Sequence, residues 1–325
     1  MPQTSEIEVS VVIPVYGSAS ILPELIQRLE TQLNGAFEGR YEVVLVDDRS
    51  PDDAWHVIEN LARGRTWLRA ISLRKNAGQH NAIMAGLGIA RGHCIVTMDD
   101  DLQHDPADVA RIVARLHDGY DVVYAQFDRR EHALWKRLGS RFNDFIARRL
   151  LDKPGGLYLS PLRGMRGKIR DEIVRYQGPF VYLDGLLLQS SDNIGTIEAR
   201  HHRRSDGRSG YSLRKSISLW LQMATSFSVM PLRMVSLAGI LASCLGFALA
   251  LLVFVQKLLT PDMAIGWASL IITILMMGGL QLLALGAIGE YVGRVLLSLN
   301  KRPQFVVGRT INTDDDAAAR ISGEQ

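Results

Sequence analysis

Residues 9–15 have the sequence VSVVIPV, a short β-branched run that is typical of a strand buried on both faces of a parallel sheet. Similar runs follow it along the chain, and they are YEVVLV at 41–46, LRAISL at 68–73, HCIVTM at 93–98 and DVVYA at 121–125. Helical patterns separate them near residues 20–34, 53–63, 78–90 and 106–118. The alternation predicts an open, mostly parallel α/β sheet covered by helices. Ligands of such sheets bind beyond the carboxyl ends of the strands.

Polar residues follow the predicted strands at these carboxyl ends. They are Tyr16 after the first run, Asp47 and Asp48 after the second, Asn76 to Gln79 after the third, and Asp99, Asp100 and Asp101 after the fourth. The segment PVYGSASILPEL after the first run contains neither a P-loop nor the Gly-x-Gly-x-x-Gly pattern of dinucleotide-binding folds. Clustered carboxylates instead favour a divalent metal that carries the phosphates of a nucleotide.

Two long apolar runs lie in the C-terminal third of the chain. Residues 234–256 and 263–289 contain no Asp, Glu, Lys or Arg. A helix needs roughly 20 apolar residues to cross a hydrocarbon core of about 30 Å, so both runs predict transmembrane helices. The expected organisation is a soluble domain over residues 1–210, an amphipathic interfacial helix over 211–230, a two-span region over 231–294, and a tail over 295–325 that is disordered from about residue 312.

Composition narrows the class of protein. The chain has 37 Lys plus Arg against 34 Asp plus Glu, and this net charge of +3 is too small to favour nucleic acid as a partner. The cations gather before the first apolar run, in RRSDGRSGYSLRK at 203–215, where they can contact anionic lipid head groups. Only Cys94 and Cys244 are present, which excludes a domain held together by disulfides.

The charges that flank the apolar runs predict their orientation. Cations precede the first run and follow the second at Arg214, Lys215, Arg233, Arg294, Lys301, Arg302 and Arg309, whereas the connecting QKLLTPD has one Lys and one Asp. By the positive-inside rule both chain ends are expected in the cytoplasm, with two spans in the inner membrane. The N-terminal segment also lacks the pattern of a signal peptide. Gly- and Ala-rich faces on the spans would allow close helix packing and hence a homo-oligomer.

Four motifs occur in order with the paired spans: SVVIPVYG at 10–17, LVDDRSPDD at 45–53, NAGQHNA at 76–82 and TMDDDLQHDP at 97–106. Together they resemble the GT-A type family 2 glycosyltransferases, and in particular their polyisoprenyl-phosphate group. The resemblance extends over about residues 9–303. It implies a Rossmann-like GT-A catalytic domain, a nucleotide-diphosphate sugar as donor, a polyprenyl phosphate of the undecaprenyl type as acceptor, and Mg²⁺ or Mn²⁺ as cofactor.

The resemblance also implies a donor site. Asp99, Asp101 and Gln103 would bind the metal on the donor diphosphate, and hard oxygen ligands suit Mg²⁺ or Mn²⁺. Capping of the helix expected near residue 106 is the alternative role for these acids. The donor-binding residues would be Pro14, Val15, Tyr16, Asp47, Asp48, Asn76, Gly78, Gln79, Asp99 and Asp100, with Asp47 supporting the pocket from behind.

Three features of this donor site leave alternatives open. The family sequence Asp-Asp-Gly-Ser is DDRS here, and Arg49 in place of Gly leaves the local turn geometry open. Asp48 could instead only form a turn before Ser50. His80 lies either beside the donor or simply at the start of a helix.

A phosphate-binding motif of the family, Arg-x-x-Gly-x-Ser, is matched by RSDGRS at 204–209. The resemblance implies that Arg204 and Ser209 hold phosphate oxygens of the donor or of the lipid, with Arg208 and Lys215 as further contacts. Arginine suits this role because its planar fork donates two parallel hydrogen bonds to a phosphate. Gly210 stands where relatives have Lys or Asn. A solvated basic face is the alternative interpretation.

Relatives often carry an Asp six residues before the Arg of a Phe/Leu-Arg pair. Matching PLR at 161–163 places Leu157 or Tyr158 there, so this acid is missing. A phosphomonoester acceptor has a second pKa of about 6 and is largely dianionic at pH 7, so it needs no base. It needs its charge held near the anomeric carbon, and the predicted catalytic residues are therefore Asp101, Arg163 and Arg204.

The predicted function is a membrane-anchored, metal-dependent glycosyltransferase that moves a sugar to a polyprenyl phosphate with inversion. A processive polysaccharide synthase would need more spans and a Gln-x-x-Arg-Trp motif, and neither is present. A catalytically silent nucleotide-binding scaffold is the alternative from another class. Leu157 and Gly210 favour that scaffold, whereas the intact Asp99, Asp101 and Gln103 oppose it.

Overall fold

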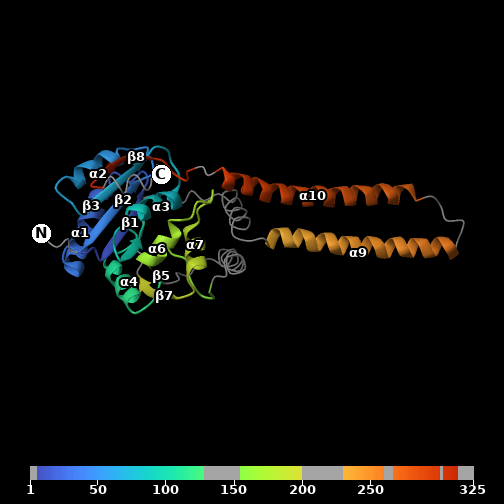
Figure 1. The fold of residues 1–325 in the computed structure, drawn as a ribbon, viewed down its shortest axis with the longest axis horizontal. Helices are drawn as coiled ribbons and strands as arrows, with labels where there is room; N and C mark the ends of the chain where they lie inside the picture. The colour runs from blue at the N-terminus through green and yellow to red at the C-terminus, as the bar shows by residue number, and fades with distance from the viewer. Residues whose placement is uncertain (1–5, 128–153, 200–229, 260–265, 301–302, 314–325) are drawn as a thin grey trace. The chain divides into compact units, whose positions relative to one another are not determined.

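The computed structural model describes residues 6–127, 154–199, 230–259, 266–300 and 303–313 (Figure 1). The chain divides into two compact units. The first, which we call the sheet unit, comprises Met1–Gly210 and Lys301–Gln325. The second, the helix unit, comprises Tyr211–Asn300. The sheet unit is therefore built from two stretches of chain that are separated in sequence by the helix unit.

The sheet unit contains one mostly parallel sheet with the strand order β7-β5-β6-β4-β1-β2-β3-β8. Its strands are β1 (Val9–Val15), β2 (Tyr41–Asp47), β3 (Leu68–Leu73), β4 (Cys94–Thr97), β5 (Val122–Phe127), β6 (Arg163–Arg166), β7 (Ile194–Ala199) and β8 (Val307–Ile311). The first five match the five predicted runs, so the expected open α/β sheet is confirmed. β6 and β8, which the sequence patterns did not predict, pair antiparallel with their neighbours.

Helices cover both faces of the sheet, as Figure 1 shows. They are α1 (Leu22–Phe37), α2 (Ala54–Ala62), α3 (Gln79–Ile89), α4 (Ala107–His117), α6 (Gly167–Ile173) and α7 (Leu183–Ser190). α1 contacts α2 and α4, while α3 packs on β1 and β2. α3 lies so close that a Cβ on Gly86 would be 2.4 Å from Val12 Cγ1. The central strands are thus buried on both faces, as their continuous apolar sequences predicted.

β8 is the chain's return to the sheet after the helix unit. It pairs antiparallel with β3, with Ala70 opposite Ile311 and Ser72 opposite Arg309. Asn312 follows it, and its Nδ2 donates to the carbonyl oxygens of Arg65 at 3.0 Å and Leu68 at 2.8 Å. The tail thus contributes an edge strand to the sheet unit. The predicted disorder beyond residue 312 concerns residues 314–325, which lie outside the described part of the chain.

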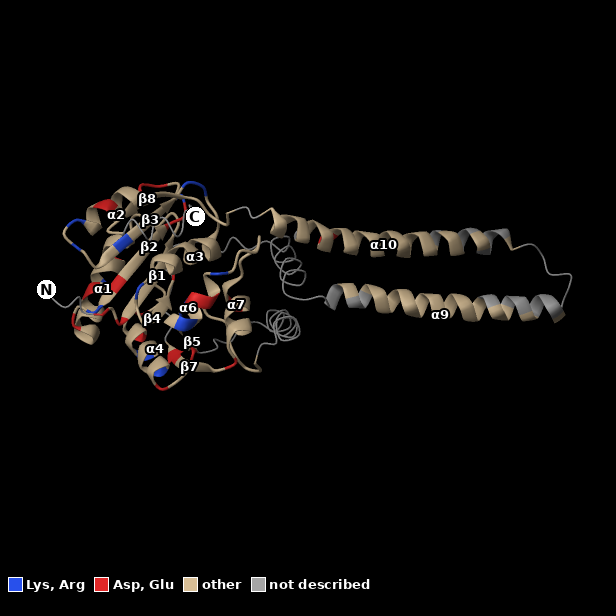
Figure 2. Ribbon diagram, viewed as in Figure 1, with Lys and Arg blue, Asp and Glu red and all other residues tan. Residues whose placement is uncertain are grey.

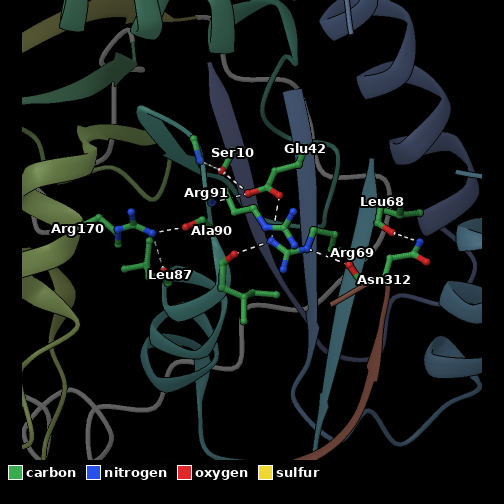
Figure 3. A network of polar contacts seen from close by, with 11 residues as sticks. Ser10, Glu42, Leu68, Arg69, Leu87, Ala90, Arg91, Arg170 and Asn312 are labelled. Carbon is green, nitrogen blue, oxygen red and sulfur yellow. Dashed lines mark hydrogen bonds and ion pairs between the residues drawn. The ribbon is translucent and has the colours of Figure 1, made fainter. Parts of the chain in front are cut away.

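A buried ion pair joins this edge strand to the centre of the sheet unit (Figure 3). Arg69 Nη1 lies 3.0 Å from Glu42 Oε2, and both side chains are almost fully buried. Arg69 Nε also donates to the carbonyl of Asn312 at 3.1 Å, and Ser10 Oγ donates to Glu42 Oε1 at 2.6 Å. Ser10, Glu42 and Arg69 are each the second residue of their strand. The network therefore lies at the edge of the sheet opposite to the carboxyl ends of β1, β2 and β3.

The helix unit contains α9 (Met230–Leu259) and α10 (Trp267–Leu299). Figure 2, in which the ribbon is coloured by residue type, shows that charged residues are frequent in the sheet unit and almost absent from the described parts of these two helices. In α10 the segment Met276–Leu299 is long and apolar enough to cross a membrane, and α9 contains the shorter apolar segment Val235–Leu249. The two predicted apolar runs fall largely within these helices. The predicted interfacial helix over 211–230 lies almost wholly outside the described residues.

We predict that Glu42→Gln lowers the free energy of unfolding by about 3 to 5 kcal/mol, because it leaves the buried Arg69 guanidinium without its counter-ion. The matched control is Arg28→Gln, which breaks the exposed ion pair between Arg28 and Glu24 on α1. That change should cost less than about 1 kcal/mol. Chemical unfolding of the full chain in detergent compares the two variants, and equal small losses would contradict a structural role for the buried pair.

Candidate functional site

The loop after β1 is fixed by an acid from the loop after β4. The backbone N–H of Tyr16 donates to Asp100 Oδ2 at 3.1 Å, and the hydroxyl of Ser18 donates to the same oxygen. Burial raises the pKa of Asp100, while these two hydrogen bonds oppose the shift. Pro14 and Val15 are buried in β1, whereas the Tyr16 ring is 57% exposed at the edge of the sheet. Tyr16 therefore presents an open aromatic surface beside the Asp99–Asp101 loop.

The two acids after β2 have different surroundings. Asp48 accepts the backbone N–H of Ala77 at 2.6 Å and that of Gly78 at 2.8 Å. Burial raises the pKa of Asp48, although both hydrogen bonds lower it. Asp47 instead accepts the Ser72 hydroxyl from β3 at 2.8 Å and the backbone N–H of Ser50 at 2.9 Å. Asp48 thus fixes the loop after β3, and this role goes beyond forming the turn before Ser50. Asp47 supports this edge of the sheet from the interior.

The turn after β2 keeps an unusual backbone conformation despite the substitution of glycine. Arg49 has φ of 57°, in the left-handed region that favours glycine. The question left open by the DDRS sequence is thereby answered, because this turn accommodates arginine at the strained position.

The loop after β3 connects three strand ends. Asn76 Nδ2 donates to the carbonyl of Asp48 at 3.1 Å, Gly78 has φ of 88°, and Gln79 Nε2 donates to Asp99 Oδ1 at 2.7 Å. The predicted donor residues Tyr16, Asp48, Asn76, Gly78, Gln79, Asp99 and Asp100 are therefore gathered at one edge of the sheet. Their contacts with a nucleotide remain a prediction.

The acids at 99–101 do not cap the following helix. α4 begins at Ala107, whose backbone N–H is bound at 3.0 Å by Asp105 Oδ1, and no side chain caps the helix from Pro106. Asp101 Oδ1 accepts the backbone N–H of Gln103 at 3.1 Å within its own turn. The capping alternative thus applies to Asp105, and Asp99 and Asp101 remain candidates for binding a ligand.

The donor set of this loop fits a metal that is shared with phosphate. Among the described residues, no group of three His, Cys, Asp or Glu side chains gathers as in an all-protein metal cage. Asp99 and Asp101 are partly exposed carboxylates in one tight turn. Mg²⁺ is characteristically bound by one or two carboxylates, with substrate phosphates and water completing the shell.

Arg163, a predicted catalytic residue, is buried and forms an ion pair with an acid from α7. It lies in β6 and forms an ion pair with Asp184 in the first turn of α7, and its Nε donates to Thr97 Oγ1 at 3.3 Å. The Tyr124 hydroxyl donates to Asp184 Oδ1 at 3.0 Å. Burial alone would lower the pKa of Arg163, but Asp184 and Tyr124 raise it above its usual range. In this arrangement the guanidinium is oriented by the protein itself, and direct contact with an acceptor phosphate remains a prediction.

Asp184 is the residue of this region that sequence reasoning missed. The missing acid was sought at Leu157 and Tyr158, of which Leu157 is buried and Tyr158 is 54% exposed. The structure supplies a carboxylate from α7 instead, 21 residues beyond Arg163. Its only sequence signal is an acid in an apolar helical stretch, VYLDGLLL, since such an acid needs a buried partner.

His80 lies between the donor loop and the Arg163 ion pair. Its ring meets Tyr182 edge to face at 5.3 Å, and its Nδ1 is buried without a hydrogen-bond partner among the described residues. Burial and the nearby charge of Arg163 lower the pKa of His80 to about 4, with Asp184 acting in the opposite direction. The imidazole is therefore neutral at physiological pH.

The remaining predicted phosphate-binding residues are Arg204, Arg208, Ser209 and Lys215. They lie outside the described residues, so their roles stay predictions.

We predict that His80 makes the folded chain sensitive to acid. Because its folded pKa lies below the ordinary value of about 6.5, the stability it contributes is present above pH 6.5 and is lost as the pH falls towards 4. The wild type should lose roughly 3 kcal/mol in this window that His80→Gln does not lose. Unfolding curves at pH 7, 6, 5 and 4 measure the difference. The exposed His56 on α2 provides the control His56→Gln, and a profile for His80→Gln parallel to that of the wild type would contradict the assignment.

Comparison with known proteins places these features in a family. The family model described as glycosyl transferase family 2 matches residues 10–174. The chain is 33% identical over 315 residues to an undecaprenyl-phosphate 4-deoxy-4-formamido-L-arabinose transferase from Klebsiella pneumoniae, with 96% of each chain covered. It is also 33% identical over 308 residues to the enzyme of that name from Enterobacter sp. (strain 638), with 94% of each chain covered. These alignments include the helix unit as well as the sheet unit.

Solved structures are similar in fold. Glucosyl-3-phosphoglycerate synthase from Mycobacterium tuberculosis, in complex with Mn²⁺, uridine diphosphate and phosphoglyceric acid, aligns with a TM-score of 0.50 and 17% identity. The alignment covers 67% of this chain and 76% of that one. This likeness concerns the fold, and it confirms the predicted GT-A type sheet. Together with the family model and the relatives of similar length, it confirms the resemblance drawn from the strand-end motifs: the chain belongs to glycosyl transferase family 2 and is a glycosyltransferase.

Proposed function

We propose that this glycosyltransferase moves a sugar from a nucleotide-diphosphate sugar to undecaprenyl phosphate or a similar polyprenyl phosphate, with inversion at the anomeric carbon. The observation that carries the proposal is the 33% identity, over 96% of both chains, to a transferase named for undecaprenyl phosphate. The gathered strand-end residues support it, because they form a polar site where ligands of open α/β sheets bind.

The donor is expected to lie across the carboxyl ends of β1, β2 and β4. The exposed Tyr16 ring offers a stacking surface for the base, and Asp48 holds the loop that carries Gly78 and Gln79. A Mg²⁺ or Mn²⁺ ion held by Asp99 and Asp101, with Gln103 nearby, would offset the charge on the departing nucleoside diphosphate. Gln79 orients the Asp99 carboxylate through its hydrogen bond.

The acceptor phosphate is proposed to be the nucleophile without help from a base. A phosphomonoester is largely dianionic at pH 7, so one of its oxygens can attack the anomeric carbon directly. Asp184 is an acid in this region, but its carboxylate is bound by Arg163 and Tyr124. Its proposed task is to hold Arg163 in place. Arg204, Ser209, Arg208 and Lys215 are proposed to bind phosphate oxygens.

The silent-scaffold alternative is less well supported than catalysis. A scaffold that only binds a nucleotide does not account for the 33% identity, over 96% of both chains, to a transferase. The scaffold would be favoured if the protein bound nucleotides but transferred no sugar.

The connectivity of the sheet supports two membrane crossings. β7 precedes the helix unit and β8 follows it, yet both belong to one sheet. An odd number of crossings would place β8 on the opposite side of the membrane from β3, with which it pairs. At 1.5 Å per residue, α9 and α10 are about 45 and 50 Å long, and each is long enough for a core of about 30 Å. We therefore propose two spans in the inner membrane, with the sheet unit and both chain ends in the cytoplasm.

Contacts outside the sheet unit are also part of the proposal. The basic stretch at 203–215 would contact anionic lipid head groups and bring the site close to the lipid phosphate. Homo-oligomers formed through the Gly-rich faces of the spans are a further proposal, without a subunit number.

The direct test of the function is a substrate panel. Full-length protein in detergent would receive UDP-, GDP- or dTDP-sugars with Mg²⁺ or Mn²⁺ and a short-chain polyprenyl phosphate, and glycolipid formation would be scored. Formation of a glycosylated polyprenyl phosphate with one donor supports the proposal. Nucleotide binding without any transfer across the panel would favour the scaffold.

We predict that Asp101→Asn reduces transfer at least about 100-fold without lowering thermal stability, because it removes one charge from the proposed metal site. The control is Asp105→Asn in the same loop. Asp105 caps α4, and Asn keeps the oxygen that accepts the Ala107 N–H, so this variant loses the same charge but should keep both its stability and most of its activity. Turnover measured against Mg²⁺ and Mn²⁺ concentration separates the two variants. Near-normal turnover of Asp101→Asn at limiting metal would disprove the assignment.

Membrane topology gives another prediction. In a Cys244→Ser background, Asp262→Cys lies between α9 and α10, and Thr310→Cys lies in β8. A membrane-impermeant maleimide should label the first in intact spheroplasts and the second only after permeabilisation. Labelling of both variants in intact spheroplasts, or of neither, would contradict the two-span arrangement.

A further inference from the structure

The segment over residues 303–313, which we call the return segment, brings the chain back from α10 into the sheet unit. Its far end is anchored by Asn312 and by the Arg69 network of Figure 3, at the edge of the sheet away from the strand-end site. Its near end lies beside the carboxyl end of β3, which is followed by the donor loop at residues 76–79. The return segment therefore runs along the whole of β3 and reaches the edge of the sheet that carries the site.

At this near end, Gln304 binds the loop that leads into α7. Its Nε2 donates to the carbonyl oxygens of Tyr176 and Gly178, each at 2.9 Å. This loop continues to Tyr182, whose ring packs on His80, and to Asp184, which forms the ion pair with Arg163. The side-chain amide of Gln304 thus uses both of its hydrogens to hold the start of the loop that leads to Tyr182 and Asp184.

Two residues further on, the return segment binds the other side of the site. The backbone N–H of Arg74 donates to the carbonyl of Val306 at 2.8 Å, and Arg74 Nε donates to that of Val307 at 3.2 Å. Arg74 lies two residues before the donor loop at residues 76–79, in which the backbone amides of Ala77 and Gly78 are held by Asp48. Residues 304–307 therefore join the loop before α3 to the loop before α7. His80 of α3 and Tyr182 of α7 meet between them.

We propose that Gln304 is a positioning residue for the transfer reaction, which fixes the α7 loop, and with it Asp184 and Arg163, relative to the donor loop. The inference rests on the proposed function and deepens it. Gln304 binds the backbone carbonyls of Tyr176 and Gly178, so it acts through the backbone of residues 176–178. Misplacement of reacting groups by about 1 Å can reduce a rate by up to about 100-fold. A loop that lost both hydrogen bonds from Gln304 would be free to move on that scale.

The chain contains a matched control for this role. Asn312 also carries a side-chain amide that donates both hydrogens to two backbone carbonyls, but it does so at the opposite edge of the sheet. Gln304→Glu and Asn312→Asp make the same change, replacing two donors by a carboxylate that faces two carbonyl oxygens. Both variants lose the same bonds, and only the first loses them beside the site.

The experiment uses both variants as full-length protein in detergent. With the donor and metal that the substrate panel identifies, Gln304→Glu should lower kcat by about 10-fold or more, while Asn312→Asp stays within about 2-fold of the wild type at a matched loss of Tm. Hydrogen exchange provides a readout that does not depend on activity. The amides of residues 179–187 should exchange faster in Gln304→Glu than in Asn312→Asp.

The outcomes are distinguishable. Equal losses of kcat in the two variants would show that Gln304 is only a structural residue and would overturn the inference. Unchanged exchange over residues 179–187 in Gln304→Glu would overturn it as well. If the wild type transfers no sugar from any donor, the proposed function fails, and hydrogen exchange alone then decides whether Gln304 positions the loop.

Discussion

The central constraint on this protein is the burial of β1, β2 and β3 on both faces. Most side chains in these strands are apolar, and the polar ones, Ser10, Glu42, Asp47, Arg69 and Ser72, occupy the first two or last two positions of their strands, so polar chemistry is confined to the places where the strands end. Because β1, β2, β3 and β4 run parallel, their carboxyl ends meet at one edge. Asp48, Gln79, Asp99 and Asp100 bind one another's loops there, and each loop is held by a residue from a different strand end.

The same constraint explains which parts of the fold could be predicted from sequence. Strands buried on both faces have continuous apolar sequences, so β1 to β5 and the residues that follow them were accessible to pattern analysis. β6 has the sequence RGMR and β8 has VGRTI, and neither contains such a run. Both pair at positions set by distant parts of the chain. β8 is placed by β3 and by the buried Arg69, more than 200 residues before it, which local patterns do not encode.

The candidate site shows a similar division. Motifs predicted which residues gather at the strand ends, because each motif follows its own strand directly. The partners of those residues were harder to predict. Asp184 reaches Arg163 from α7, 21 residues away along the chain, and this contact depends on tertiary packing. Asp105 rather than the 99–101 acids caps α4, and this assignment depends on which backbone N–H groups need a partner. Arg49 shows that a family glycine can be replaced where the rest of the turn fixes the backbone.

The pairing of β3 with β8 has a consequence for the order in which the chain is made. The hydrogen bond from Arg69 to Asn312 joins residues 243 positions apart, and both long helices are synthesised between them. Until the ribosome has completed residue 312, the outer edge of β3 lacks its strand, and Arg69 lacks one of its buried acceptors. An uncovered strand edge is a template for wrong pairing. Newly made chains thus pass through a period in which both helices are already available for insertion while the outer edge of β3 is still open.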